Sequence, residues 1–246
     1  MENKRVIVIG GITGGIGSAL KQRLLDAGDT VAGFSRNGDS SSGGDAVHHV
    51  TCDATQCDQI EQTLKDIHTE FGRIDAYVHA IGSIYLKPAH LTPESDWLQT
   101  LHQNLSSAFY GLRAATKLMT KQGSGKCLFF STAAAQVGLG NHEAIAAAKG
   151  GIEAMVRSAA STYSNRRIRI NAIAPSLTDT PLSKMITSSE QALEFSKKMH
   201  PLGEIGVADH VASLAQWLLS EEARFVTGQT YVMDGGLSSI VPKPKV

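Results

Sequence analysis

Short apolar runs rich in β-branched residues alternate with longer amphipathic stretches along most of the chain. Several of the short runs are apolar throughout, which is typical of strands buried on both faces of a parallel sheet. The alternation indicates repeated strand–helix–strand units in an α/β fold. The strands are expected at residues 5–9, 30–34, 47–50, 74–80, 126–130, 168–172 and 230–233.

Two of the amphipathic stretches carry apolar residues at three- and four-residue spacing, which predicts helices. They cover residues 17–28 and 58–72, and both end at glycine, a residue that commonly terminates helices. The stretch 37–45 is too polar and too rich in glycine for a helix, so a mobile loop is expected there. Residues 241–246 are expected to form a loosely held tail.

The composition narrows the classes of function. The 246 residues suffice for one large α/β domain or two small ones, and no stretch resembles a linker. With 23 basic and 23 acidic residues the formal net charge is zero, so no affinity for nucleic acid or for an anionic membrane is expected. The partner is therefore expected to be a small molecule or another copy of the chain.

The cysteines and the N-terminal residues indicate the cellular compartment in which the protein is expected. Cys52, Cys57 and Cys127 form no C-x-x-C pair, so we expect free, mostly buried thiols in a reducing compartment. The N-terminal apolar run spans only about five residues before glycines interrupt it, too short for a signal peptide or a spanning helix. A cytoplasmic protein without a metal site is expected, since the histidine spacing also suggests no metal ligands.

The most informative stretch is VIVIGGITGGIGSAL, where five glycines separate a predicted strand from a predicted helix. Glycines at this place permit a tight turn and close approach of the backbone to a pyrophosphate, while the helix N-terminus supplies unpaired N–H groups for the anion. A merely structural glycine turn is the alternative. The context favours nucleotide binding.

These glycines and a series of later motifs resemble the short-chain dehydrogenase/reductase family. Gly11, Gly15 and Gly17 match its G-x-x-x-G-x-G spacing, with Gly10 where the family usually has threonine. The further matches follow in the family's order: CDAT at 52–55, HAIG at 79–82, QNLSSAF at 103–109, FFSTAA at 129–134, IRINAIAPSLTDTPL at 168–182 and VTGQTYVMDGG at 226–236.

The resemblance implies a single Rossmann domain over residues 1–246, a doubly wound seven-stranded parallel sheet with helices on both faces. It also implies a substrate lid near 182–203, a homodimer or homotetramer, and a nicotinamide cofactor along the carboxyl ends of the strands. Asp53 would hydrogen-bond the adenine amine, and Gly82 would let the backbone pass close to the ribose. The cofactor residues implied are Gly11, Thr13, Gly14, Gly15, Ile16, Gly17, Ser35, Arg36, Asp53, Ala54, Ala80, Gly82, Lys149, Pro175, Ser176 and Thr180.

The end of the second strand indicates which nicotinamide cofactor is used. Ser35 occupies the place where NAD-preferring members carry an acidic residue, and Arg36 follows it. A carboxylate there would repel a 2′-phosphate, whereas serine can hydrogen-bond it and arginine offers a planar fork. NADP is therefore favoured, and NAD stays possible because the glycine loop lacks a second basic residue. A solvated loop charge is the other interpretation of Arg36.

The family's reaction centre is a serine, a tyrosine and a lysine, with an asparagine on a neighbouring helix. Asn104, Lys149 and, in the serine's place, Thr132 are present, but the tyrosine position four residues before Lys149 is Ile145. Isoleucine cannot donate a proton. Lys149 can still hold the nicotinamide ribose.

His142 is the candidate replacement for the missing acid. It lies seven residues before Lys149 and thus on the same helix face. Enoyl reductases of this family carry their substrate-facing tyrosine at that spacing. At the first turn of a helix the dipole favours a neutral imidazole, which can still donate one hydrogen bond. Alternatively, His142 is an ordinary exposed residue of the first turn, with the helix capped by Gly140 or Asn141.

The functions compatible with these residues fall into three classes. The first is reduction of a carbonyl or of an activated C=C bond of a small, mostly apolar substrate, with Asn104, Thr132, His142 and Lys149 as catalytic residues. The second is an inactive nucleotide-binding homologue that acts as a sensor or partner subunit. The third is a non-redox lyase or isomerase. His79 is interpreted as a packing or cofactor-side residue rather than a catalyst, and Tyr85 as an ordinary loop residue that could alternatively cover the nicotinamide.

Overall fold

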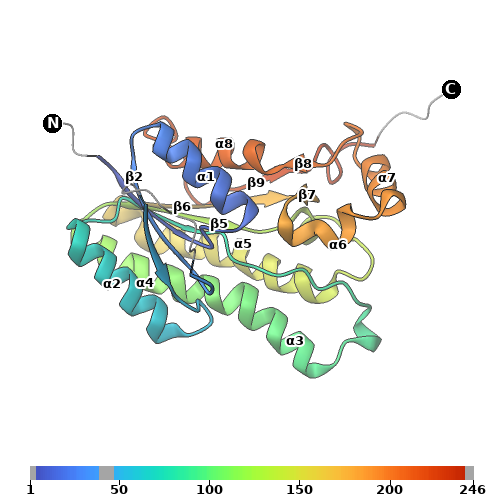
Figure 1. Ribbon diagram of the computed structural model, residues 1–246, viewed down its shortest axis with the longest axis horizontal. Helices are drawn as coiled ribbons and strands as arrows, with labels where there is room; N and C mark the ends of the chain where they lie inside the picture. The colour runs from blue at the N-terminus through green and yellow to red at the C-terminus, as the bar shows by residue number, and fades with distance from the viewer. Residues whose placement is uncertain (1–3, 39–46, 242–246) are drawn as a thin grey trace.

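The seven segments expected as strands form one parallel sheet in the computed structural model, which describes residues 4–38 and 47–241. The strand order is β3-β2-β1-β4-β5-β6-β9. The chain therefore has the doubly wound Rossmann architecture (Figure 1). The strands are β1 (Val6–Gly10), β2 (Thr30–Ser35), β3 (Val47–Thr51), β4 (Ala76–His79), β5 (Gly125–Phe130), β6 (Ile168–Pro175) and β9 (Thr230–Met233).

Two of the expected strands differ in length from the sequence pattern. The strand predicted at 74–80 is shorter, because Ile74 and Asp75 lead into β4 and only Ala76–His79 pair with β5. The strand predicted at 168–172 is longer, because β6 continues to Pro175 opposite β9. The extension places Pro175 and Ser176 at the carboxyl edge of the sheet.

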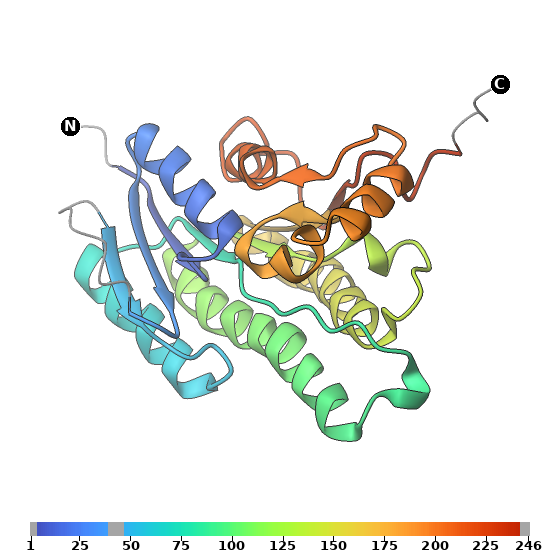
Figure 2. The same cartoon turned by 45° about the vertical axis from the view of Figure 1, so that its right-hand side comes forward.

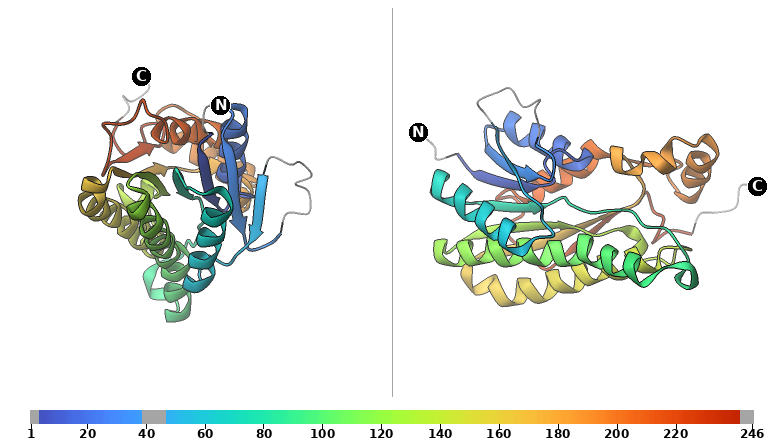
Figure 3. Two further views of the ribbon diagram at one scale, coloured as in Figure 1. Left: turned by 90° about the vertical axis from the view of Figure 1, so that its left-hand side faces the viewer. Right: turned by 60° about the horizontal axis from the view of Figure 1, so that its bottom comes forward.

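Helices cover both faces of the sheet. Helices α1 and α8 pack together on one face, and α2 and α4 lie with α5 on the other (Figures 1 and 3). Each helical layer closes its own apolar core against the sheet. The main helices are α1 (Gly15–Asp26), α2 (Cys57–Phe71), α3 (Glu94–Leu101), α4 (Ser107–Gln122), α5 (Glu143–Tyr163) and α8 (Ala208–Leu218).

The segment expected as a substrate lid folds into short helices beside the carboxyl edge of the sheet, shown in orange in Figure 2. A further two-stranded sheet, β7 with β8, flanks it. These elements are β7 (Thr178–Asp179), a 3₁₀ turn (Pro181–Ser183), α6 (Lys184–Thr187), α7 (Glu190–Met199) and β8 (Gly206–Val207). Short 3₁₀ turns elsewhere cover Ala89–Leu91, Ala133–Ala135 and Ser164–Arg166.

The predicted end of α2 and the predicted cysteine states agree with the structure, whereas α1 ends at Asp26 with Ala27 as its C-cap, one residue before the predicted Gly28. Gly72 caps α2 with φ 75°, in the left-handed region that glycine adopts without strain. All three cysteines are free, and two are buried. Most of the loop predicted at 37–45 and of the tail predicted at 241–246 lies outside the described residues. Within the described ranges no helix has the length and apolarity needed to cross a membrane, and no cluster of potential metal ligands occurs.

His79 is part of the core, as its interpretation as a packing residue requires. It is 1% exposed and lies between the hydroxyls of Tyr77, at 2.8 Å, and Ser107, at 3.1 Å. Because Ser107 donates its proton to the carbonyl of Gln103, it accepts from His79 Nε2–H, and Tyr77 donates to Nδ1. Burial, aided by the charge of Lys149, lowers the pKa of His79 to about 3.

The lowered pKa predicts acid sensitivity. Between pH 6.5 and pH 3 the unfolded chain takes up a proton that the folded chain refuses, so folding stability falls as the pH falls through this window. A His79→Asn variant lacks this linkage. From pH 7 to pH 5 we expect wild type to lose about 2 kcal/mol more than the variant in urea unfolding. Equal losses would contradict a neutral, buried His79.

Candidate active site

The glycine-rich loop after β1 is built for close approach of another backbone or a ligand. Gly11 has φ 81°, and a Cβ there would lie 2.6 Å from the carbonyl oxygen of Ala80. The Gly14 N–H donates to Gly11 O at 3.0 Å, which closes the turn. A side chain on Gly17 would collide with the same Gly11 carbonyl. These positions therefore exclude larger residues, as the motif predicts.

The N-terminus of α1 lies open to the carboxyl edge of the sheet. Its N-cap, Gly14, supplies no side-chain hydrogen bond to the first turn. A Cβ on Gly15 would lie 2.7 Å from the side chain of Thr180, so the loop after β7 faces the loop after β1. Unpaired helix N–H groups in a glycine cradle fit the pyrophosphate of a dinucleotide.

The ends of β2 and β3 hold the residues expected at the adenosine. The hydroxyl of Ser35 donates to Asn37 O at 2.6 Å and lies 2.9 Å from His49 Nε2, so it is left only as an acceptor. Arg36 is exposed beside Asp53. Partial burial of Asp53 is outweighed by hydrogen bonds from Thr55 and by the charge of Arg36, which together lower the pKa of its carboxyl. Arg36 and Asp53 therefore lie beside each other, just after the ends of β2 and β3.

Lys149 forms the floor of the site. Its Nζ donates to Phe130 O at 2.9 Å, at the end of β5, and the residue is 7% exposed. A Cβ on Gly82 would lie 3.1 Å from this Nζ and 2.9 Å from Asn104 Oδ1, so a side chain there would displace the ends of both side chains. Burial lowers the pKa of the Lys149 ammonium to about 8.

Asn104 sits in a single π-helical turn, His102–Ser106, between α3 and α4. Its amide accepts from Ser83 N–H at 3.0 Å and donates to the carbonyl of Thr100 at 2.9 Å. π-Turns of this kind frequently occur at functional sites. The sequence analysis found Asn104 by its motif but gave no sign of the π-turn, because nothing in the local pattern distinguishes it from a regular helix.

Thr132 lies two residues after β5 and caps the following 3₁₀ turn. Its hydroxyl accepts from Ala134 N–H at 3.3 Å, so its own proton is free for another partner. Directly behind it, Ser131 donates to the buried carboxylate of Glu153 at 2.7 Å, and Gln136 donates to the same carboxylate at 2.7 Å. This network, which the sequence analysis missed, fixes the junction between β5 and α5.

Ile145 and His142 face the same cavity as Lys149. Ile145 is 6% exposed and offers only methyl groups at the expected tyrosine position. His142 is the N-cap of α5 rather than a residue of its first turn, and Nδ1 lies 2.7 Å from Gly140 O. A carbonyl can only accept, so Nδ1 carries the proton, and the neutral ring presents an unprotonated Nε2.

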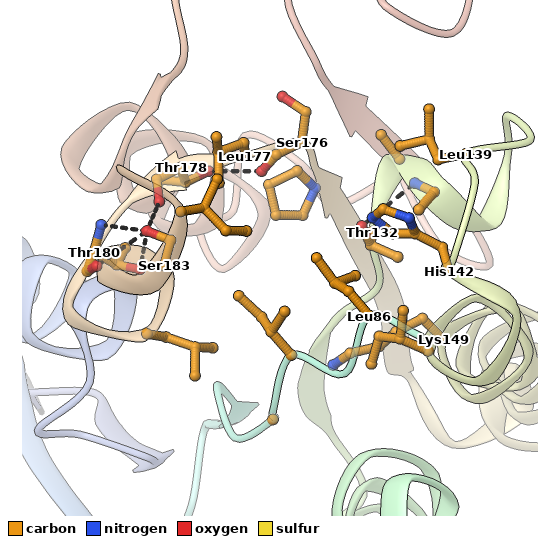
Figure 4. Close-up of a pocket in the computed structure, with 18 of the residues that line it drawn as sticks. Leu86, Thr132, Leu139, His142, Lys149, Ser176, Leu177, Thr178, Thr180 and Ser183 are labelled. Atoms are coloured by element: carbon orange, nitrogen blue, oxygen red, sulfur yellow. Dashed lines mark hydrogen bonds between the residues drawn. The ribbon is translucent and has the colours of Figure 1, made fainter. Parts of the chain in front are cut away.

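The cavity has a volume of about 620 Å³ and brings together residues from the whole length of the chain. Figure 4 shows Thr132, His142 and Lys149 on one side and Thr178, Thr180 and Ser183 on the other. Apolar side chains from the lid and from the β4 loop line much of the rest. Nine of the predicted site residues border it: Ile16, Ala80, Gly82, Thr132, His142, Lys149, Pro175, Ser176 and Thr180.

Tyr85 and His200, which lie outside the predicted catalytic set, differ in their relation to the cavity. Tyr85 does not line it, and its hydroxyl donates to Asp96 at 2.9 Å. His200, from the end of the lid, does line the cavity and lies 2.8 Å from the hydroxyl of Ser176. No local signal identifies this pair, because its members are 24 residues apart and meet only when the lid folds.

Known proteins resemble the chain over nearly its full length. A family model described as enoyl-(acyl carrier protein) reductase matches residues 11–238. A D-threitol dehydrogenase from Mycolicibacterium smegmatis is 30% identical over 240 residues, covering 94% of this chain and 92% of the relative.

Solved structures agree with the fold. The ligand-free aldohexose dehydrogenase of Thermoplasma acidophilum superposes with a TM-score of 0.90 at 27% identity, covering 99% of this chain and 98% of that one. A gluconate 5-dehydrogenase from Burkholderia cenocepacia J2315, in complex with NADP and tartrate, gives a TM-score of 0.91 at 25% identity, with 96% of each chain covered. With its motifs, sheet order and matched length in agreement, the chain belongs to the short-chain dehydrogenase/reductase family.

Proposed function

We propose that the protein is an NADPH-dependent oxidoreductase that reduces a carbonyl or an activated C=C bond of a small, mostly apolar substrate. The observation that carries the proposal is the convergence of Lys149, Asn104 and Gly82 beneath one cavity, next to the glycine cradle. A nicotinamide cofactor fits this arrangement, and when bound it supplies the hydride. NADP is present in the solved gluconate dehydrogenase relative, which supports the choice of cofactor class.

Three residues are proposed to hold and orient the reactants. The Lys149 ammonium binds the nicotinamide ribose hydroxyls, and Asn104 keeps the Ser83 loop in place beside it. The Thr132 hydroxyl, whose proton is free, donates to the substrate oxygen on which negative charge develops. Apolar walls exclude water and strengthen these contacts.

His142 is proposed to supply the proton. Because its Nδ1–H is committed to Gly140 O, the neutral ring can accept but not donate through Nε2. Reduction therefore uses the imidazolium, and oxidation of an alcohol uses the neutral ring as base. The half-buried position lets His142 exchange protons with solvent.

The choice between the two reductions stays open within the proposal. The matching family model carries the name of an enoyl reductase, whereas the D-threitol relative is a polyol dehydrogenase. Hydride addition to an activated C=C bond gives an enolate, which Thr132 alone can stabilise by a hydrogen bond. Addition to a carbonyl gives an alkoxide, which needs the His142 proton at once.

An inactive nucleotide-binding role is the second candidate, and Ile145 is the observation that favours it. The buried Lys149 argues against an inactive role. A buried ammonium lowers folding stability, so a chain that did not use the lysine would be more stable with an apolar residue in its place.

The assembly proposed is a homotetramer or a homodimer in the cytoplasm. On the α3–α4 side of the molecule, Leu98 is 54% exposed and Phe109 is 51% exposed. On the neighbouring α5, Ala147 and Ala154 are exposed and share one helix face, which permits close packing against a second copy.

The cofactor preference can be tested at Arg36. In fluorescence titrations, Arg36→Ala should weaken NADPH binding about tenfold through loss of a charge-assisted hydrogen bond, and leave NADH binding unchanged. Arg157→Ala, an exposed arginine on α5, is the matched control. Equal weakening of both cofactors would contradict a contact with the 2′-phosphate.

Lys149→Met should weaken NADPH binding and raise folding stability. NADPH affinity should fall at least tenfold, since the ribose loses its ammonium partner. Folding should gain roughly 1 to 2 kcal/mol at pH 7, because the charge is no longer buried. The gain should vanish as the pH rises from about 8 to 10.5, because Lys149 loses its proton in the folded wild-type chain at a lower pH than in the unfolded chain. Thermal denaturation across this range measures it; a variant less stable at pH 7 would contradict the assignment.

His142→Phe tests the proton donor. Turnover of a ketone should fall about a hundredfold or more, the usual effect of losing a general acid. The exposed neighbour Glu143, changed to Gln, should leave turnover unaltered. If His142→Phe stays within about threefold of wild type, the role belongs to another group.

A further inference from the structure

The lid end of the cavity holds a polar pair among apolar residues, a buried histidine and a half-buried serine. His200 follows α7, is 5% exposed, and places Nε2 2.8 Å from the hydroxyl of Ser176, which follows β6. Both residues border the cavity, together with the apolar Leu177, Phe195 and Met199. Ser176 occupies a place where the family usually has glycine, so its hydroxyl is an addition in this chain.

The direction of the hydrogen bonds in this pair is fixed. His200 Nδ1 lies 2.6 Å from the carbonyl oxygen of Ser196, which can only accept, so Nδ1 carries the proton. In a neutral imidazole Nε2 is then an acceptor, and the Ser176 hydroxyl donates its proton to it. The lone pairs of the Ser176 oxygen remain. Beside a neutral imidazole, Ser176 can therefore offer a substrate only an acceptor.

The sheet register places this acceptor near the proposed reaction centre. Phe130 on β5 lies opposite Ile173 on β6, and Ser131 N–H donates to Ile173 O at 2.8 Å. Thr132 follows β5 by two residues and Ser176 follows β6 directly, and both side chains border the same cavity. A donor at Thr132 and an acceptor at Ser176 thus lie within reach of neighbouring substrate atoms. Ser176 is at the top of Figure 4, above the cavity.

We propose that Ser176, oriented by His200, accepts a hydrogen bond from a substrate hydroxyl on the carbon next to the reacting carbonyl, and so selects hydroxyketones with an apolar remainder. Ser176 is the specificity-determining residue and His200 the positioning residue. The inference rests on the proposed reductase function and narrows its substrate class. A site that hydrogen-bonds a substrate hydroxyl discriminates against the analogue that lacks it, because the acceptor is left unpaired.

The test compares two probes at pH 8: a straight-chain methyl ketone and the same ketone with a hydroxyl on the methyl carbon. Wild type should reduce the hydroxyketone with a kcat/KM about tenfold higher, the value of one neutral hydrogen bond. Ser176→Gly should bring the ratio of the two kcat/KM values to about one, and Ser176→Thr, which keeps the hydroxyl, should retain the preference. Calorimetric binding of both ketones to the NADPH-bound protein should give the same ranking.

Controls separate this role from anchoring of the lid. Ser196→Ala removes another hydroxyl that borders the cavity but keeps the carbonyl that holds His200. It should preserve the preference, whereas a structural role for Ser176 would slow both ketones alike. Equal use of both ketones by wild type, or an unchanged preference in Ser176→Gly, overturns the inference and leaves the reductase function standing. If neither ketone is reduced, the reductase function fails on these substrates, and the calorimetric ranking alone decides the inference.

Discussion

The burial of one ammonium group governs the site. Lys149 reaches from α5 under the cavity to the last carbonyl of β5, and its proton is retained at neutral pH although burial lowers its pKa to about 8. A side chain at Gly82 would displace the ends of both the Lys149 and the Asn104 side chains. One buried charge thus ties together α5, the end of β5, the β4 loop and the π-turn that carries Asn104. A structural core would favour an apolar residue here, so the charge is best explained by a ligand.

Ile145 changes which proton donors and acceptors the cavity beside Lys149 offers. With isoleucine at this position the cavity has no phenol. The remaining polar side chains differ in whether they can donate or accept a hydrogen bond. Thr132 has a free proton to donate, neutral His142 has an acceptor to offer, and Ser176 has its proton committed to His200. The site is therefore suited to stabilising a developing oxyanion first and to completing proton transfer through a histidine in contact with solvent.

Much of the fold and of the cofactor cradle follows from local sequence. Alternating apolar runs predicted all seven strands, and glycines at 11, 15 and 17 predicted the turn whose geometry excludes side chains. The features that escaped prediction depend on contacts between distant segments. The tautomer of His142 depends on the Gly140 carbonyl, the pairing of His200 with Ser176 depends on how the lid folds, and Glu153 meets Ser131 only through the packing of α5 on β5. Residue type gives the candidates, and tertiary structure assigns their hydrogen bonds.

The most direct measurement is NADPH consumption by wild type and by Ile145→Tyr on one panel of enones and ketones, followed by absorbance. The structure predicts that wild type turns over at least one member, because Lys149, Thr132 and His142 already supply binding, oxyanion stabilisation and a proton. It also predicts that the added phenol is dispensable. A silent wild type beside an active Ile145→Tyr variant would contradict this account and show a dormant site that lacks only its tyrosine.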